Sequence, residues 1–217
     1  MQKNALVAGA AFMALCVCSC KKNSPVIISK PVVYDNYTQL KTGNYWIYQV
    51  YNVDSMGNGP ALNQFDSTYV RADTVIHGNT YYQVVSTTPP YNYDIWLRDS
   101  LHYLVNQYGK IQFSAQDFTN TFTSGPFLFD PQQGDTIAWF TQKMADKNAL
   151  FNTPAGTFVT SDFQTIYDMY PGHNQAGTHR VIHKRFAGNV GVVSETIPFY
   201  ALSPGYKEKR LVRFHLN

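Results

Sequence analysis

Residues Asn44–Asp54 read NYWIYQVYNVD, and this stretch decides the fold. Successive side chains of a β-strand point to opposite faces of its sheet, so Trp46, Tyr48 and Val50 share one face. Aromatic and β-branched residues are enriched in strands, where they pack on a pleated, half-buried surface. The stretch therefore predicts a strand that turns one apolar face toward a core.

The same alternation returns along the rest of the chain. Short runs of apolar and aromatic residues, separated by turns rich in Gly, Pro, Asn and Asp, predict further strands. Residues 115–125 are ambiguous, and residues 147–153 favour a single helical turn or a loop. The predicted strands cover residues 65–76, 80–88, 93–98, 101–106, 110–114, 135–145, 156–167, 178–186, 190–197 and 209–216.

This succession of strands predicts the fold class. Consecutive strands joined by short turns, without helical crossovers, pair antiparallel. A sheet of about ten strands curls rather than stays flat. We therefore expect an all-β fold, an antiparallel meander forming a partly closed barrel or sandwich, with little helix outside an amino-terminal signal peptide.

The amino-terminal segment has the layout of a secretory signal peptide. Lys3 supplies a positive charge, and the uncharged apolar run Ala5–Val17 follows it. This run is shorter than the roughly 20 apolar residues that a membrane-spanning helix needs. Residues 17–20, VCSC, resemble the bacterial lipobox, in which an aliphatic residue and two small residues precede an invariant cysteine.

The lipobox resemblance implies a lipid anchor. Residues 15–18 fit the pattern less well, because the residue before the cut would be the branched Val17, so we expect cleavage directly before Cys20. In such precursors the cysteine thiol takes a diacylglycerol and the new amino terminus takes a third acyl chain. Two or more chains anchor a protein stably, so the membrane is a predicted partner through the lipid on Cys20.

The residues after the cysteine imply a location. In lipoprotein sorting, an aspartate directly after the cysteine retains the protein at the inner membrane, whereas Lys21 stands there in this chain. Residues 21–24, KKNS, also lack the acidic residues of surface-export signals. Both features imply a lipid-anchored protein on the periplasmic face of the outer membrane.

The predicted domains and the redox chemistry follow from the same cut. Residues 1–19 form the signal peptide, residues 20–40 the lipidated cysteine and a tether, and residues 41–217 a single β-barrel-like domain. The three cysteines stand at positions 16, 18 and 20, so the mature chain would have neither a free thiol nor a disulfide. This count excludes a cysteine nucleophile, a redox pair and a thiolate zinc site.

The charge pattern argues against nucleic acid as a partner. Charged residues make up 14% of the chain and the formal net charge is +3, which gives no extended basic surface. Residues 207–213, KEKRLVR, are the one basic run, and they alternate as a strand would. We interpret this run as a solvated strand face rather than a binding patch.

The motifs of common enzymes are missing from the sequence. It contains neither a GxSxG nucleophile turn nor an HExxH zinc motif. His179 and His183 share a strand face about 13 Å apart, too far to bind one metal ion. Residues 130–135, DPQQGD, lack the ligand density of a calcium loop and indicate a turn. We therefore predict no catalytic residue, no metal site and no cofactor.

The surplus of aromatic residues is the feature that favours a binding site. Tyrosines and one tryptophan gather within residues 81–108, and a barrel lined by such side chains could hold a small ligand. The predicted ligand-binding residues are Tyr82, Tyr93, Trp96 and Tyr103. The alternative, which strand preferences favour, is that these tyrosines occupy half-buried strand faces and bind nothing.

Three stretches resemble a family of β-rich bacterial lipoproteins of unknown function. They are Leu40–Gln49 (LKTGNYWIYQ), Thr153–Phe158 (TPAGTF) and Val190–Ser194 (VGVVS), in the family's order. The resemblance implies an antiparallel, partly closed barrel and no particular activity. From the residues alone, Pro154 and Gly156 predict a turn that begins a strand.

Three hypotheses about function remain open. The first is a membrane-anchored envelope lipoprotein that is not an enzyme and binds a small apolar ligand or an envelope protein. The second is a hydrolase that acts on envelope glycans or esters through Asp and His residues; an aspartate beside His179 or His183 in one cleft would favour it. The third is a purely structural subunit of an envelope assembly.

Overall fold

The computed structural model describes residues 34–87, 93–130, 134–197 and 205–217. Cys20, the predicted signal peptide and the first part of the predicted tether lie outside these ranges. The predicted turn at residues 130–135 is described only in part. Within the described ranges, no helix has the length and apolar character needed to cross a membrane.

The described residues form one sheet of strands, all of them antiparallel to their neighbours. The strands are β1 (Tyr45–Val53), β2 (Ala61–Ile76), β3 (Asn79–Ser86), β4 (Tyr93–Ser100), β5 (Tyr103–Asn106), β6 (Ile111–Ser114), β7 (Thr121–Asp130), β8 (Asp135–Thr153), β9 (Gly156–Met169), β10 (His179–Ala187), β11 (Gly191–Ile197) and β12 (Tyr206–His215).

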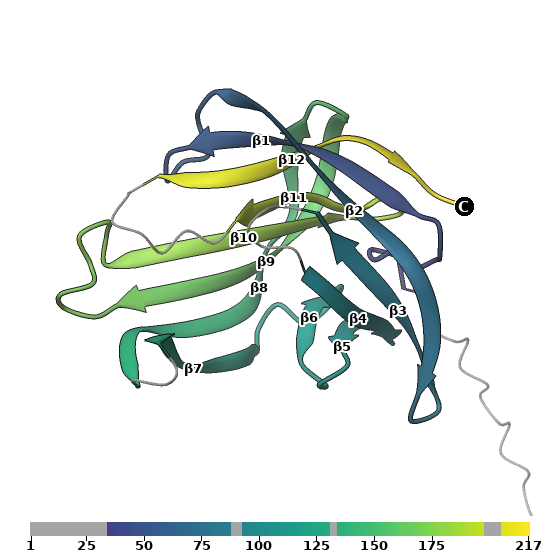
Figure 1. The fold of residues 1–217 in the computed structure, drawn as a ribbon, viewed down its shortest axis with the longest axis horizontal. Helices are drawn as coiled ribbons and strands as arrows, with labels where there is room; N and C mark the ends of the chain where they lie inside the picture. The colour runs from purple at the N-terminus through teal and green to yellow at the C-terminus, as the bar shows by residue number, and fades with distance from the viewer. Residues whose placement is uncertain (1–33, 88–92, 131–133, 198–204) are drawn as a thin grey trace, which may run out of the picture. The chain divides into compact units, whose positions relative to one another are not determined.

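The sheet consists of two meanders joined at its centre. The strand order is β6-β5-β4-β3-β2-β1-β12-β11-β10-β9-β8-β7, so β1 and β12, the first and last of these strands in the sequence, are neighbours, and β6 and β7 are the two edges. Figure 1 shows β2, β1, β12, β11 and β10 crossing the upper part of the domain, whereas β6 and β7 lie below. Because a sheet this wide twists and curls, it forms a partly closed barrel, which confirms the predicted all-β class.

The opening strand β1 behaves as its sequence predicts. Trp46, Tyr48 and Val50 are buried. The polar side-chain atoms of Trp46 and Tyr48 each form a hydrogen bond. The Trp46 indole Nε1 donates to the Val190 carbonyl at 2.7 Å, and the Tyr48 hydroxyl donates to the Val192 carbonyl at 2.9 Å. These bonds connect β1 to the residues that begin β11, so one strand organises both halves of the core.

The strand β8 is longer than its sequence predicts. Residues 147–153, expected as a helical turn or loop, continue β8 and pair with β9, so that expectation was wrong. A bulge between Ala145 and Ala149 absorbs the irregular sequence, since Asp146 and Asn148 adopt positive φ values of 47° and 64° there. Beyond the bulge, the Ala155 amide donates to the Leu211 carbonyl at 3.0 Å, which attaches the hairpin to β12.

Residues 34–40, which the sequence analysis placed in the tether, pack against the barrel. The Tyr37 ring lies 5.2 Å from the ring of Phe113, between centroids. The Asn189 amide donates to the Asn36 carbonyl at 2.7 Å. This segment therefore contacts strands from both meanders.

The basic run at residues 207–213 is not a solvated face. Glu208 and Lys209 are 3% and 2% exposed, so the interpretation from charge was wrong. The reason is topological: β12 lies between β1 and β11 in the middle of the sheet. Lys209 faces the barrel interior, and Glu208 on the opposite face pairs with Arg185 and Arg210 at 3.1 and 2.6 Å.

Candidate functional site

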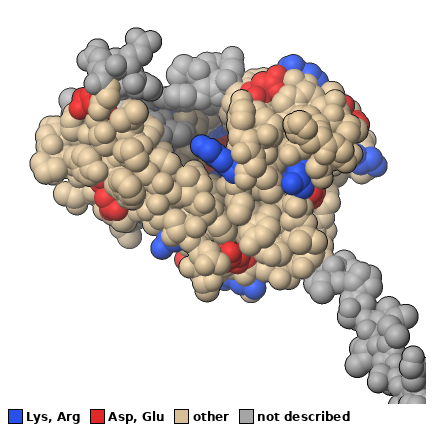
Figure 2. Space-filling model, turned by 90° about the horizontal axis from the view of Figure 1, so that it is seen from below, with Lys and Arg blue, Asp and Glu red and all other residues tan. Residues whose placement is uncertain are grey.

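A cavity of about 250 Å³ lies inside the barrel. Its walls come from β1, β2, β3, β4, β5, β6, β10 and β11 and from residues 38–40. Most of the lining is apolar, and it includes Trp46, Tyr48, Val84, Leu97 and Phe186. Figure 2 shows a hollow on one face of the molecule, and the charged side chains on that face are scattered in both signs rather than gathered into a basic patch.

A group of buried and partly buried charges borders one side of this cavity. The Lys209 ammonium lies 3.0 Å from the Asp66 carboxylate and 2.9 Å from the Glu195 carboxylate. Lys184 approaches the other oxygen of Glu195 at 3.0 Å. We call these four residues, from β2, β10, β11 and β12, the charge cluster. Lys184 and Glu195 also line the cavity.

Within the charge cluster, Glu195 and the two lysines favour their charged forms. Burial alone would raise the pKa of Glu195, but the two lysines beside it outweigh burial and lower the pKa to about 2. Burial opposes the charges of Lys184 and Lys209 as well, yet the Glu195 carboxylate holds the pKa of both lysines above its ordinary value. The cluster thus places fixed positive and negative charges beside an otherwise apolar space.

Aromatic rings surround the two ammonium groups. Lys184 lies 5.8 Å from the centre of the Tyr93 ring, and Lys209 lies 5.7 Å from the same ring. Lys209 also lies 5.1 Å above the Tyr48 ring. These distances suit cation–π attraction, which is stronger away from water. Thr68 lines the same cavity, and its buried hydroxyl has no hydrogen-bond partner in the described part of the chain.

The structure separates the four aromatic residues that the sequence singled out. Tyr93 lines the cavity. Tyr82 packs against the hydrophobic core but does not line the cavity. Trp96 alternates with two cavity-lining residues on β4, so it points to the other face of the sheet. Tyr103 donates to Asp117 at 3.3 Å and lines a second pocket of about 210 Å³, which residues 34–38 also line.

Sequence reasoning missed the polar residues of the cavity. Lys184 and Thr68 were not singled out, although the signal for Lys184 is present in residues 179–187, HRVIHKRFA. In a strand, Lys184 shares a face with Ile182 and Phe186, so an inward apolar face would carry a lysine with it. No local signal identifies Thr68, because its burial depends on strands distant in the sequence.

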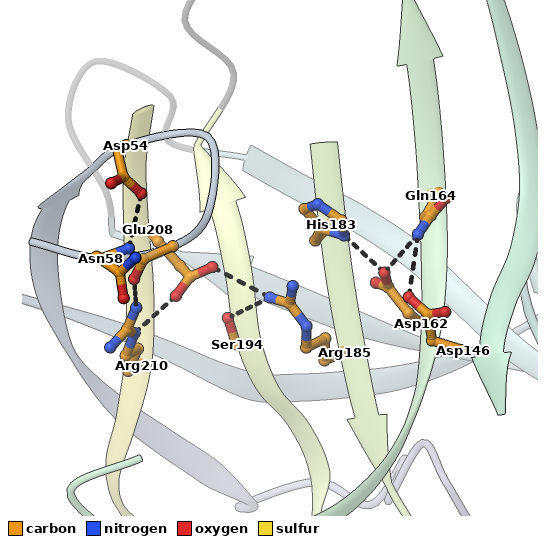
Figure 3. A network of polar contacts seen from close by, with 11 residues as sticks. Asp54, Asn58, Asp146, Asp162, Gln164, His183, Arg185, Ser194, Glu208 and Arg210 are labelled. Atoms are coloured by element: carbon orange, nitrogen blue, oxygen red, sulfur yellow. Dashed lines mark hydrogen bonds and ion pairs between the residues drawn. The ribbon is translucent and has the colours of Figure 1, made fainter. Parts of the chain in front are cut away.

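A second polar network lies on the opposite face of β10. Figure 3 shows His183 directed at Asp162, and Arg185 between Ser194 and Glu208. The His183 Nδ1 lies 2.6 Å from the Asp162 carboxylate. Since His183 and Arg185 alternate with Lys184 along the strand, this network is separated from the cavity by the sheet itself.

The histidine–aspartate pairs do not form a recognisable catalytic site. His179 also meets an aspartate, Asp168, at 2.7 Å, but both side chains are exposed. In the described part of the chain, no hydroxyl group is hydrogen-bonded to His179 or His183, and neither residue lines the cavity. A nucleophile activated by histidine needs such contact. Among the residues that the structure describes, no group of three or more His, Cys, Asp or Glu could hold a metal ion.

Comparisons with known proteins give only distant similarity. No family model and no curated protein matches the sequence. A protein predicted to be a lipoprotein, from Parabacteroides distasonis, has 14% identity and a TM-score of 0.45, covering 85% of this chain and 100% of its own. A protein predicted to be exported, with a YmcC-like fold, from Bacteroides fragilis, has 11% identity and a TM-score of 0.43, covering 84% of this chain and 100% of its own. Neither similarity indicates what this chain binds.

Proposed function

We propose that this chain is an envelope lipoprotein, held on a membrane by lipid on Cys20, whose barrel binds a small and mostly apolar molecule. In this proposal it is a binding module and not an enzyme. The observation that carries the proposal is the cavity of about 250 Å³, because its mostly apolar lining also includes polar side chains, among them Lys184, Glu195 and Gln112.

The size of the cavity limits the ligand. Protein interiors are normally packed without voids larger than a water molecule, so a partly open space of this size inside the barrel is a candidate binding site that a ligand can enter. An apolar cavity of about 150 Å³ binds benzene. By proportion, a cavity of about 250 Å³ accepts a molecule of about ten non-hydrogen atoms. That is a compact ring system or short chain, smaller than the ligands of most drug-sized pockets.

The cavity can be tested with iodobenzene, whose iodine quenches tryptophan fluorescence on contact. Trp46 lines the cavity, so a protein with the changes Trp96→Phe and Trp139→Phe reports on Trp46 within the described residues. We expect saturable quenching in the mature, acylated protein held in phospholipid nanodiscs. Empty nanodiscs give the correction for probe that dissolves in lipid.

Two matched variants decide whether the quenching comes from the cavity. Val84 lines the cavity, and Val84→Phe fills part of it, so quenching should weaken at least tenfold. Val75 is 68% exposed, and Val75→Phe adds the same group outside the cavity, so quenching should be unchanged. Linear quenching without saturation, or equal quenching in both variants, would show that the cavity does not bind small apolar molecules.

The anchor is tested separately, by labelling growing cells with radioactive palmitate. Cys20→Ser should abolish labelling and leave an uncleaved or soluble precursor, because the thiol that takes the diacylglycerol is lost. Cys18→Ser, two residues earlier, is the matched control and should be labelled normally. Labelling that persists in Cys20→Ser and disappears in Cys18→Ser would move the anchor to Cys18. The proposed location on the periplasmic face of the outer membrane, which the Lys21 position favours, predicts resistance to protease added to intact cells.

A further inference from the structure

We infer that residues 34–38 are a gate, which moves aside when a small molecule enters or leaves the cavity. We call these residues the strap. The inference rests on the proposed function, because it describes how access to the same cavity is controlled. It comes from four features: the hollows on both sides of the strap, its position outside the sheet, the backbone that connects it to β1, and the local contacts that hold it closed.

The strap separates two hollows. Thr38 lines the cavity, and residues 34–38 line the second pocket of about 210 Å³. Thr38 and Leu104 line both spaces, so they form a thin wall between them. Dense packing is what holds side chains in place inside a protein. A segment with space on both sides lacks part of this packing, and the strap therefore has room to move into the second pocket.

The strap belongs to no strand, unlike most of the cavity wall. The backbone pairing of the sheet begins at Gly43, whose amide donates to the Val70 carbonyl at 3.0 Å. The strap is folded on itself instead, because the Asn36 side-chain oxygen accepts from the amides of Thr38 and Gln39 at 3.1 and 2.9 Å. It can therefore move as one compact turn without breaking the ladder bonds of any strand.

Two residues with positive φ connect the strap to β1. Gln39 has a φ of 52° and Gly43 a φ of 92°. Residues other than glycine seldom adopt such a conformation, and hinges are formed by a few loop residues that absorb a change in φ and ψ. The buried Asn44 side chain donates to the Gln39 carbonyl at 2.8 Å, which fixes the base of the strap to the barrel. Residues 39–43 therefore provide a pivot next to a fixed point.

Local contacts hold the strap against the barrel. The Asn189 amide donates to the Asn36 carbonyl at 2.7 Å, and the Thr38 hydroxyl donates to the Asp99 carboxylate at 2.7 Å. The Tyr37 ring packs against the hydrophobic core. These contacts connect the strap to β4 in one meander and to the turn between β10 and β11 in the other. Single hydrogen bonds of this kind can open locally while the sheet stays folded.

A disulfide can lock the strap in this closed position. A Cβ atom at Gly188 would lie 4.0 Å from the Asp35 Cβ atom, and the Cβ atoms of a disulfide are about 3.5–4.5 Å apart. The predicted mature chain has no free thiol, so oxidation of Asp35→Cys/Gly188→Cys can pair only the two new cysteines. Dithiothreitol opens the bond again, so the locked and the free strap are compared in the same protein.

The exchange of iodobenzene is followed by stopped-flow fluorescence of the Trp46 reporter in nanodiscs. Release is measured by mixing the loaded protein with a large excess of empty nanodiscs, which take up the free probe. We expect the disulfide to slow binding and release alike, by about tenfold or more, with the affinity changed less than about twofold, because a gate alters the path and not the bound state. Dithiothreitol should restore both rates. Asp35→Ser/Gly188→Ser cannot form the bond and should exchange as fast as the unlocked protein under both conditions.

A second variant loosens the strap. Asn36→Ala removes the oxygen that accepts the Thr38 and Gln39 amides, so the closed conformation loses stability and exchange should become about threefold to tenfold faster. Asn79→Ala is the matched control, because Asn79 donates to the His77 carbonyl at 3.2 Å in a turn that does not line the cavity. Exchange in Asn79→Ala should not change. Equal exchange in the two variants would contradict the assignment of the moving part to the strap.

The outcomes separate the inference from the proposed function. If iodobenzene quenching does not saturate with the strap either locked or free, the proposed function fails and the gate fails with it. If quenching saturates but exchange is equally fast before and after reduction, the molecule enters by another route, and this inference alone is overturned. A locked protein that loses affinity without slower exchange would overturn it as well, since the strap would then be only a part of the binding surface. Failure of the two cysteines to pair would contradict the closed position of the strap.

Discussion

Replacing Lys209 by methionine should destabilise the folded protein severely at neutral pH. Lys209 is 2% exposed and holds two carboxylates, Asp66 at 3.0 Å and Glu195 at 2.9 Å. After the change Glu195 keeps Lys184, whereas Asp66 keeps, among the described residues, the hydroxyls of Ser86 and Thr87. Removing one partner of a buried ion pair costs about 3–5 kcal/mol. A domain of this kind is stable by about 5–15 kcal/mol in total.

The loss should depend on pH in a defined direction. The pKa of Glu195 is lowered to about 2 in the folded protein from an ordinary value of 4.5. A carboxylate whose folded pKa is depressed stabilises the fold above its unfolded pKa, and that stability disappears as the pH falls toward the folded pKa. The wild-type protein therefore loses stability between pH 4.5 and about 2. In Lys209→Met, Glu195 has lost one of the two lysines that lower its pKa, so less of this stabilisation is left to lose and the gap to wild type narrows on acidification.

Urea unfolding of the mature protein, followed by tryptophan fluorescence at pH 7 and pH 3, measures both effects. The double variant Asp66→Asn/Lys209→Met removes both partners and should recover much of the loss. Lys147→Met, at an exposed position, should change stability by no more than about 0.5 kcal/mol. A loss below about 1 kcal/mol at pH 7, or the same loss at both pH values, would refute the reasoning about the charge cluster.

Further predictions concern backbone fit and a buried hydroxyl. Gly59→Ala would place a Cβ atom 1.8 Å from the Asn52 carbonyl oxygen; the backbone must move, and we expect a loss of about 2–3 kcal/mol in urea unfolding. Gly125→Ala meets only an ordinary contact at 3.7 Å, so a comparable loss there would contradict the steric explanation. Tyr48→Phe deletes the buried donor to the Val192 carbonyl at 2.9 Å and should cost about 1–2 kcal/mol; unchanged stability would mean that this bond contributes nothing.

Local patterns were sufficient where burial follows from alternation. Trp46, Tyr48 and Val50 were assigned to the core because every second residue of the strand is aromatic or β-branched, and the structure buries all three. Strand order from β1 to β6 and from β7 to β12 followed from short turns, since a hairpin places consecutive strands side by side, whereas the separation of β6 from β7 did not. The irregular half of β8 was missed because Asp146 and Asn148 break the pattern at the bulge.

Contacts between distant residues were beyond the reach of local patterns. Residues 207–213 were correctly predicted to form a strand, but the charge of Lys209 led us to place its side chain in solvent rather than in the core. Its true side depends on Asp66, which is 143 positions away in the sequence. The same holds for the cavity, because its lining residues Thr68 and Lys184 come from different meanders and line one space only when the sheet curls. Composition indicated an aromatic site, yet only folding decides that Tyr93 faces the cavity and Trp96 does not.

Because β1 pairs with β12, the sheet cannot be completed until the last strand has been synthesised. Tyr45 is opposite His215 and Val53 is opposite Tyr206, so these strands join residues from the two ends of the domain. Sheets built from such non-local pairs fold slowly, in milliseconds to seconds. A chain that emerges amino terminus first can build the meander from β1 to β6, but one edge of β1 stays unpaired and prone to aggregation until the ten residues of β12 arrive. Protection of that edge by a chaperone would matter most during this interval.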